Sequence, residues 1–391
     1  MIGPADFAIA EADLAADLPQ QWRVTVTAAG TWNLDGPDSG LERVTITFDA
    51  SRVPRVDATV VVATDPAVAE TLSPNPGAPR TVTIAAGYGT GPLVTLAELR
   101  LDDADYADGR LTIRAVSNEQ AVLDSAELVN TYEPPARTEA TALMVDLLDI
   151  GGSFVLLNNP EALAGQILTL EAVDNVWDGL ATIAAGEGWR LYSPERDSGE
   201  GTLEIRRTPT GNEPAVVTLR TGPAGTVRDV ARSKSRALYA TEVAVIHEWT
   251  TPDGTRDRRV QAVATAPVAG IDNVRRVVYR FATAATQTQA TSAAQAYLHR
   301  ALARLTAHDV TAVNAFWLRP DMVAELETPT TGELIEQLVD RVTFTSAGVM
   351  NLTTRSIPVW WSIGDAATAY PTIAAHRAAF ATIRDAINGP S

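Results

Sequence analysis

The hydrophobic pattern between Glu171 and Arg207 predicts one compact unit, a helix followed by two strands. Val176, Leu180 and Ile183 recur at i, i+4 and i+7, which places them on one face of a helix. Asn175 precedes this helix and can cap its start. The rest of the unit is a helix stop at Gly186 and Gly188, strands around Trp189–Tyr192 and Leu203–Arg206, and a turn at Pro194, Gly199 and Gly201.

The first third of the chain predicts a sheet. Short runs rich in β-branched residues are separated by turn sequences such as Asp108-Gly109. Their spacing favours a sandwich or barrel over alternating strand–helix units. Gly87-Tyr88-Gly89-Thr90-Gly91 lacks a following lysine and helix, so it predicts a hairpin turn and not a phosphate loop. The predicted strands are residues 22–28, 43–48, 58–63, 80–86, 93–99 and 110–116.

Helices and further strands follow a break at Pro134-Pro135, where two prolines oppose both helix and ladder. A helix over residues 138–148 should bury Leu143, Met144 and Leu147. Further helices are predicted at residues 289–307 and 372–387, and strands at residues 236–249, 259–266, 273–281, 310–318, 322–327, 341–344 and 348–359.

Composition narrows the class of protein. A chain of 391 residues with 46% hydrophobic and 20% charged residues should bury two or more cores. The absence of cysteine excludes disulfides and thiolate metal sites. The N-terminal residues lack the pattern of a signal peptide, and no apolar run is long enough to span a bilayer, so we expect synthesis in a cytoplasm. A net charge of −17 argues against binding nucleic acid.

Three segments of the chain resemble bacteriophage tail hub proteins, which form a ring at the tip of the tail tube. The Glu171–Arg207 unit resembles the domain inserted in that family. Residues 80–119 look like its first barrel, with a strand, a Gly-Tyr turn and two more strands. Residues 291–329 look like its helix and following barrel strands. The family usually has a Pro-Gly-Asp turn here, and this chain has Pro320-Asp321-Met322 without the glycine.

The resemblance, which covers residues 20–360, implies an α+β fold that is mainly β. We expect two small β barrels of the tail-hub type with an inserted α+β domain and a C-terminal helix. The implied division is residues 1–134 for the first barrel, 135–224 for the insert, 225–362 for the second β region with its long helix, and 363–391 for a helical tail. Val176, Leu180 and Ile183 should then lie in a different core from Val60 and Ile84.

The same resemblance implies a structural virion protein and no enzyme. It implies a homotrimeric ring at the tail tip or baseplate, assembled in the bacterial cytoplasm, with distal tail protein, tape measure protein and tail tip or receptor-binding proteins as partners. We expect acidic side chains along the DNA passage and arginines at the seams between subunits, although the acidity could serve solubility alone. The alternatives are a receptor- or carbohydrate-binding minor tail protein and, less favoured, a wall-active glycosidase.

Acidic clusters offer little sign of a metal or of catalysis. The Asp102–Asp108 loop fails the calcium pattern, because counting from Asp103 places Ala107 and Arg114 where ligands are needed. It is interpreted as a solvated acidic turn. Glu325 and Glu327 are spaced as an inverting glycosidase pair would be, but such pairs arise by chance in a chain with 48 acidic residues. The pair Asp146 and Asp149 is interpreted in the same way.

No other motif predicts chemistry. The histidines are scattered, and the serine in Gly36-Pro37-Asp38-Ser39-Gly40 has the wrong spacing for a nucleophile elbow. Trp360-Trp361 could form an exposed docking surface for a partner or a sugar, but burial in a core and at a domain seam is favoured. No residue is therefore predicted as catalytic, cofactor-binding or metal-binding. The histidines are His247, His299, His308 and His376.

Overall fold

A computed structural model describes most of the first 356 residues, which form one compact unit. The described residues do not include Trp360-Trp361, the predicted helix at residues 372–387 or the predicted turn at residues 194–201. The described residues are 2–16, 18–27, 30–35, 39–74, 80–124, 127–151, 155–157, 170, 173–186, 189–193, 202–207, 213–222, 225–234, 240–250, 257–265, 275–281, 283–303, 306–329 and 331–356.

A thirteen-stranded sheet dominates the fold, with the order β14-β18-β21-β20-β3-β4-β7-β6-β5-β1-β2 and a branch in which β19 pairs with β20 and β13. Its N-terminal strands are β1 (Gln20–Thr27), β2 (Thr31–Asp35), β3 (Leu41–Asp49), β4 (Val56–Ala63), β5 (Thr81–Tyr88), β6 (Val94–Ala107) and β7 (Arg110–Val116). The others are β13 (Thr218–Leu219), β14 (Val227–Lys234), β18 (Thr306–Val313), β19 (Val323–Glu327), β20 (Leu334–Thr345) and β21 (Val349–Ser356).

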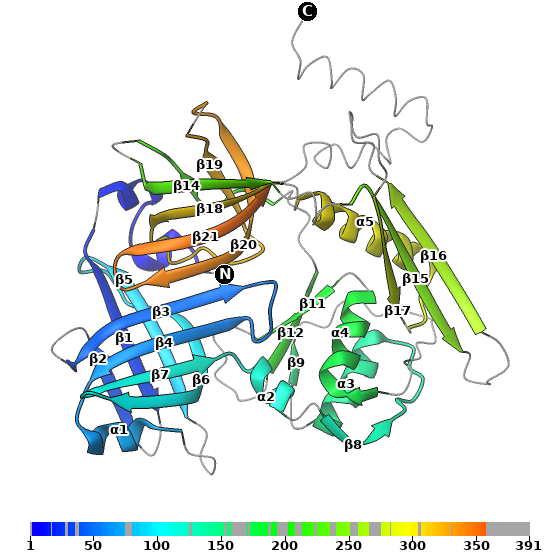
Figure 1. Ribbon diagram of the computed structural model, residues 1–391, viewed down its shortest axis with the longest axis horizontal. Coiled ribbons are helices and arrows are strands. Elements are labelled where there is room, and N and C mark those ends of the chain that lie inside the picture. The colour runs from blue at the N-terminus through cyan, green and yellow to red at the C-terminus, as the bar shows by residue number, and fades with distance from the viewer. Residues whose placement is uncertain are drawn as a thin grey trace, which may run out of the picture. The chain divides into compact units, whose positions relative to one another are not determined.

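The N-terminal strands and the C-terminal strands join in this sheet through the antiparallel pairing of β3 with β20 (Figure 1). In this pairing Ile46 lies opposite Phe344. Val24 of β1 and Val60 of β4 share a core although β5, β6 and β7 separate their strands. The sheet must therefore curl around that core. The expected mainly β fold is confirmed, and the two barrel regions are curled halves of one continuous sheet.

Aromatic side chains fill the joint between the two halves. Phe316 precedes β19, and its ring centroid lies 5.1 Å from that of Trp22 and 5.5 Å from that of Phe344. Two short 3-10 helices at the N-terminus, Pro4–Phe7 and Glu11–Ala16, add Phe7 and Leu14 to the same core. The sequence pattern did not predict these helices, nor α1 (Pro66–Leu72) and α2 (Glu119–Asp124).

A second core belongs to the inserted α+β region. It is built by α3 (Ala140–Gly151), α4 (Val176–Gly186) and the sheet β11-β12-β9 (Trp189–Tyr192, Thr202–Arg207 and Val155–Leu157), beside the pair β10 (Val173–Asn175) and β8 (Glu127–Tyr132). The predicted helix start is confirmed, because Asn175 Oδ1 accepts a hydrogen bond from the Asp178 amide at 3.2 Å. Val176, Leu180 and Ile183 lie in this core, whereas Val60 and Ile84 lie in the first, as predicted.

A third layer consists of the sheet β16-β15-β17 (Asp257–Thr265, Glu242–Thr250 and Arg276–Phe281) and helix α5 (Gln287–Ala303) (Figure 1). Tyr297 of α5 stacks on Tyr279 of β17 with ring centroids 4.1 Å apart, so α5 covers this face of the sheet. The predicted helix end at residue 307 is wrong. Ala307 belongs to β18 and pairs with Arg355, because the strand ladder outweighs the apolar helical pattern there. The division of the chain at residues 134, 224 and 362 stays a prediction.

Candidate functional site

The acidic segment Asp102–Asp108 is part of a hairpin and not a loop. Strand β6 continues to Ala107, with Asp103 opposite Arg114 and Asp105 opposite Thr112 of β7. Asp108 and Gly109 take φ values of 51° and 72°, as a tight two-residue hairpin turn requires. Residues 102–107 were expected to form a loop, and this expectation was wrong. Their pairing with β7 keeps them in a strand although their side chains are mostly acidic. Within the described part of the chain, no three His, Asp or Glu side chains gather as a metal site would need.

Three of the four carboxylates considered for catalysis make structural hydrogen bonds, and the fourth, Asp149, is exposed on α3. Glu325 Oε2 accepts a hydrogen bond from Thr218 Oγ1 at 3.1 Å, and Glu327 Oε2 accepts one from the Thr221 amide at 2.8 Å. Both glutamates thus fix the segment around β13 beside β19. Asp146 accepts two hydrogen bonds from Arg137, at 2.6 and 2.8 Å.

Two of the histidines are buried in the fold. His247 Nδ1 lies 3.0 Å from Thr283 Oγ1, and His308 Nδ1 lies 2.9 Å from Gln337 Oε1. Burial lowers the pKa of both imidazoles below the ordinary value. His299 lies in α5, and His376 lies outside the described residues.

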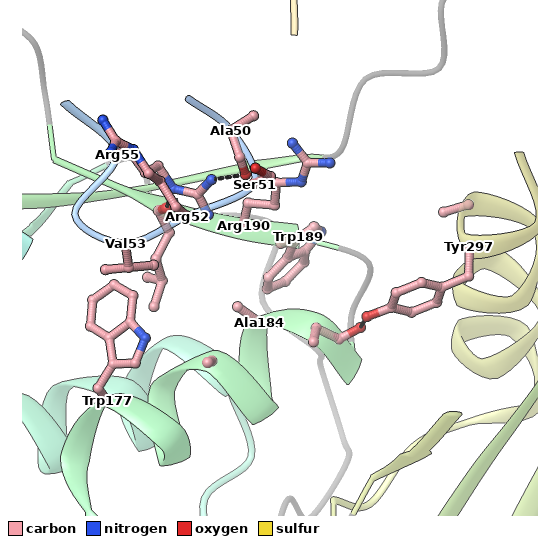
Figure 2. A pocket seen from close by; sticks show the side chains of 14 residues that line it. Ala50, Ser51, Arg52, Val53, Arg55, Trp177, Ala184, Trp189, Arg190 and Tyr297 are labelled. Atoms are coloured by element: carbon pink, nitrogen blue, oxygen red, sulfur yellow. Dashed lines mark hydrogen bonds between the residues drawn. The ribbon is translucent and has the colours of Figure 1, made fainter. Parts of the chain in front are cut away.

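A pocket of about 230 Å³ opens where four elements meet. Figure 2 shows its lining side chains, which come from the loop between β3 and β4, from α4, from β11 and from α5. Trp177, Trp189 and Tyr297 give the pocket aromatic walls, and alanines of α4 and α5 complete them. The remaining lining residues are Ala50, Ser51, Arg52, Val53, Arg55, Arg190 and Leu191.

Strand β11 carries the buried polar group of this region. Arg190 Nη1 donates hydrogen bonds to Asp321 Oδ1 at 2.7 Å and to Oδ2 at 2.9 Å, and the Tyr192 hydroxyl donates to the same carboxylate. Burial alone would lower the pKa of Arg190, but the charges of Asp321 and Tyr192 and the hydrogen bonds to both together outweigh burial, so the pKa is raised and the guanidinium stays charged. Burial, with the Asp321 charge, raises the pKa of Tyr192, which therefore keeps its proton.

Arg55 joins the barrel loop to the same strand. Its guanidinium lies 4.5 Å from the centre of the Tyr192 ring, and its Nε donates to the Leu191 carbonyl at 2.7 Å. The cation over the ring and the charge-assisted hydrogen bond each stabilise this contact. The insert is thus attached to the first barrel by side chains that are polar and specific.

The strand predicted around Trp189–Tyr192 is present. Its apolar residues alternate with Arg190 and Tyr192, which is typical of a half-buried strand, but here the second face is covered as well. Arg190 is as buried as Trp189 and Leu191, because Asp321 and the β3–β4 loop cover the second face. Partners 131 residues apart leave no local signal in the sequence. The only hint was an arginine and a tyrosine at alternate positions of a short apolar strand.

No helix among the described residues is both long enough and apolar enough to cross a membrane. No family model matches the chain, and no curated protein matches it by sequence.

Solved structures share this architecture. A tail protein from Neisseria meningitidis MC58 superimposes with a TM-score of 0.55 at 14% identity, covering 87% of this chain and 98% of that one. The 43 kDa tail protein of prophage MuSo2 from Shewanella oneidensis gives 0.56 at 16% identity, with coverages of 86% and 98%. The prophage tail protein gp18 from Listeria monocytogenes EGD-e gives 0.52 at 9% identity, with coverages of 85% and 94%.

The chain therefore has the fold of phage and prophage tail proteins. The resemblance expected from the sequence is confirmed at the level of the fold, because these superpositions span nearly the whole of the first two tail proteins.

Proposed function

We propose that this protein is a structural component of a phage-type tail, forming the hub ring at the distal end of the tail tube. The observation that carries the proposal is the match in fold to complete tail proteins. The thirteen-stranded sheet supports it, because a sheet continuous from β2 to β14 makes a stiff wall for a ring. In this proposal residues 1–134 and 225–362 form the wall, residues 135–224 form the insert, and residues 363–391 form a tail segment.

The ring is proposed to be a homotrimer, and the open face of the β16-β15-β17 sheet is proposed as its seam. Ala244 of β15 lies between Val263 of β16 and Val278 of β17 in one row across the sheet. Val263 is 48% exposed and Val278 is 45% exposed, on the face opposite α5. An apolar row on an open sheet face is typical of a surface that another protein covers.

Arginines flank this row on the same face. Arg276 pairs with Glu242, and Arg259 and Arg280 both pair with Glu248. Three guanidiniums face two carboxylates here, whereas the whole chain has a net charge of −17. A second copy of this chain, with its acidic surface, is therefore the occupant that the charge favours. Three other arginines, Arg190, Arg319 and Arg355, are buried within the chain. Arginines at the seam must therefore be exposed ones, such as Arg259, Arg276 and Arg280.

The acidic net charge also suits a tube through which DNA passes. Carboxylates along the bore would repel phosphate, and low-dielectric walls would strengthen that field. The proposed partners are the distal tail protein on the tube side, the tape measure protein in the bore, and tip or receptor-binding proteins below. The proposed location is the virion tail tip, after assembly in the host cytoplasm.

We propose no catalytic role for any residue. Glu325 and Glu327 each accept hydrogen bonds that fix β13, which leaves them poorly suited to proton transfer. A second candidate function, a receptor- or carbohydrate-binding minor tail protein, is favoured by the aromatic walls of the pocket.

Native mass spectrometry over a range of protein concentrations tests the ring. We expect trimers for the parent chain and monomers for Val263→Asp and Val278→Asp, because a charge on the apolar row opposes burial. Val145→Asp is the matched control, since Val145 is 43% exposed on α3, away from this sheet. A chain that stays monomeric at high concentration, alone and with tail components, would contradict the ring.

A further inference from the structure

The hairpin of β19 and β20 carries an exposed leucine. Leu334, the first residue of β20, is 40% exposed and lies opposite Glu327. Two residues further along β20, Glu336 lies opposite Glu325. Residues that are opposite each other, or two apart on one strand, point to the same face of a sheet. This face, called the Leu334 face below, therefore presents one apolar side chain among three carboxylates.

The carboxylates of the Leu334 face have no cationic partner within the described part of the chain. Glu325 and Glu327 accept hydrogen bonds from the segment around β13, but none of the three glutamates forms an ion pair there. Glu325 and Glu336 lie directly opposite each other, and like charges in that arrangement destabilise a strand pair. A cation supplied by another molecule would relieve this repulsion.

The open face of the β16-β15-β17 sheet has the complementary arrangement, an apolar row flanked by arginines. Arg276 and Arg280 lie two residues before and two residues after Val278 on β17, which places each about 7 Å from it on the same face. Glu336 has the same spacing from Leu334 on β20. When Leu334 packs over Val278, a carboxylate of the hairpin therefore meets a guanidinium whichever way the two strands run.

We propose that the Leu334 face of one copy of the chain docks on the apolar row of the next copy. This docking presupposes the ring proposed above and names the surface that completes its seam. β19 and β20 belong to the thirteen-stranded sheet, whereas β16-β15-β17 is a separate sheet, so each copy carries both halves of the contact (Figure 1). Two different surfaces that complement each other make a head-to-tail contact, which can close into a ring.

Tyr106 is a matched control for Leu334. It is also 40% exposed and also lies in an acidic hairpin, but it lacks the arrangement of the Leu334 face. Its hydroxyl donates to the Thr64 carbonyl at 3.3 Å. The adjacent Asp105 points to the opposite face of β6, because successive side chains of a strand alternate. An apolar side chain and a carboxylate therefore do not share one surface at this position.

Complementation between two blocked variants tests the docking. Leu334→Asp disables the hairpin and Val278→Asp disables the row, so each variant alone should be monomeric at concentrations where the parent chain is trimeric. In a mixture, the Val278→Asp copy still has an intact hairpin and the Leu334→Asp copy still has an intact row. One seam can then form, but the ring cannot close. With one variant labelled with a heavy nitrogen isotope, native mass spectrometry should detect mixed dimers and no trimers. Tyr106→Asp should form trimers like the parent.

Cysteine pairs locate the contact. The chain has no cysteine, so a disulfide can form only between introduced residues. Leu334→Cys and Val278→Cys combined in one chain should give disulfide-linked trimers under mild oxidation. Each single variant should stay unlinked, and so should the combination of Tyr106→Cys with Val278→Cys.

The outcomes separate the seam from the ring. A parent chain that never forms trimers would contradict the ring and the docking together. Trimers of Leu334→Asp, a mixture without mixed dimers, or a disulfide between two copies of the Val278→Cys variant would overturn the docking and leave the ring standing. Circular dichroism shows that each variant is folded, so a loss of assembly is not mistaken for a loss of structure.

Discussion

Arg190 and Asp321 form a buried ion pair across 131 residues of sequence, with Nη1 2.7 Å from one carboxylate oxygen and 2.9 Å from the other. The pair joins β11 of the insert to the turn that precedes β19. Asp321 has a φ of 68°, a left-handed conformation that glycine adopts most readily. Asp321 thus takes a backbone conformation that favours glycine, and its carboxylate binds Arg190 of the insert.

Removing one member of this pair should destabilise the protein strongly. We expect Arg190→Met or Asp321→Asn to lower the free energy of unfolding by about 3–5 kcal/mol, because each leaves a buried group without its partner. Urea unfolding followed by tryptophan fluorescence measures the change. The double variant should cost less than the sum of the two single changes. Additive effects would show that the two side chains are not coupled.

The backbone at Asp321 can be tested apart from its charge. Asp321→Gly and Asp321→Ala both lose the carboxylate, and they differ in their tolerance of a positive φ. Asp321→Ala should be the less stable of the two by about 1–2 kcal/mol, since a β-carbon opposes the left-handed conformation. Thermal melts of the two variants, measured side by side, decide this. An alanine variant as stable as the glycine variant would refute the assigned backbone conformation.

Stability should decline in mild acid. Burial lowers the pKa of His247 and of His308 in the folded state, whereas in the unfolded chain they titrate near 6.5. Below about pH 6.5 the unfolded chain therefore binds more protons, so stability rises with pH through this window and levels off above it. Melting temperatures from pH 5 to pH 8 should follow this curve. His247→Gln should flatten it, and a slope unchanged by that variant would contradict the assignment.

Gly186 is the last residue of α4 and packs against Thr283 and against His247 of β15, which leave little room for a side chain. A β-carbon there would lie 3.1 Å from Thr283 Oγ1 and 3.2 Å from His247 Cε1. Gly186→Ala should therefore cost about 1–3 kcal/mol through overpacking, measured by urea unfolding. Gly3→Ala is the control, because no atom lies within 4 Å of its added carbon. Equal stability of both variants would show that this contact can relax.

The acidic charge predicts that the protein does not retain DNA. With a net charge of −17, binding to duplex DNA should be undetectable even at about 50 mM salt, where phosphate contacts are strong. Fluorescence anisotropy of a labelled duplex measures this, with a basic DNA-binding protein as the positive control. Salt-sensitive binding at this ionic strength would conflict with free passage of DNA.

Periodicity alone predicted the elements whose signal is local. The α4 face of Val176, Leu180 and Ile183, its cap at Asn175 and the hairpin turn at Asp108-Gly109 follow from residues a few positions apart. The mainly β class and the order of the regions were also predicted from the sequence. Each depends on spacing and on turn chemistry, which the chain carries wherever it lies in space.

Tertiary structure alone decided which segments meet. The pairing of β3 with β20 and the end of α5 before β18 depend on ladders between strands distant in sequence. The pocket likewise takes its lining from four elements, and Arg190 finds Asp321 only when the insert packs on the barrel. A hydrophobic pattern specifies that a face must be buried but not which partner buries it, because apolar burial is non-directional.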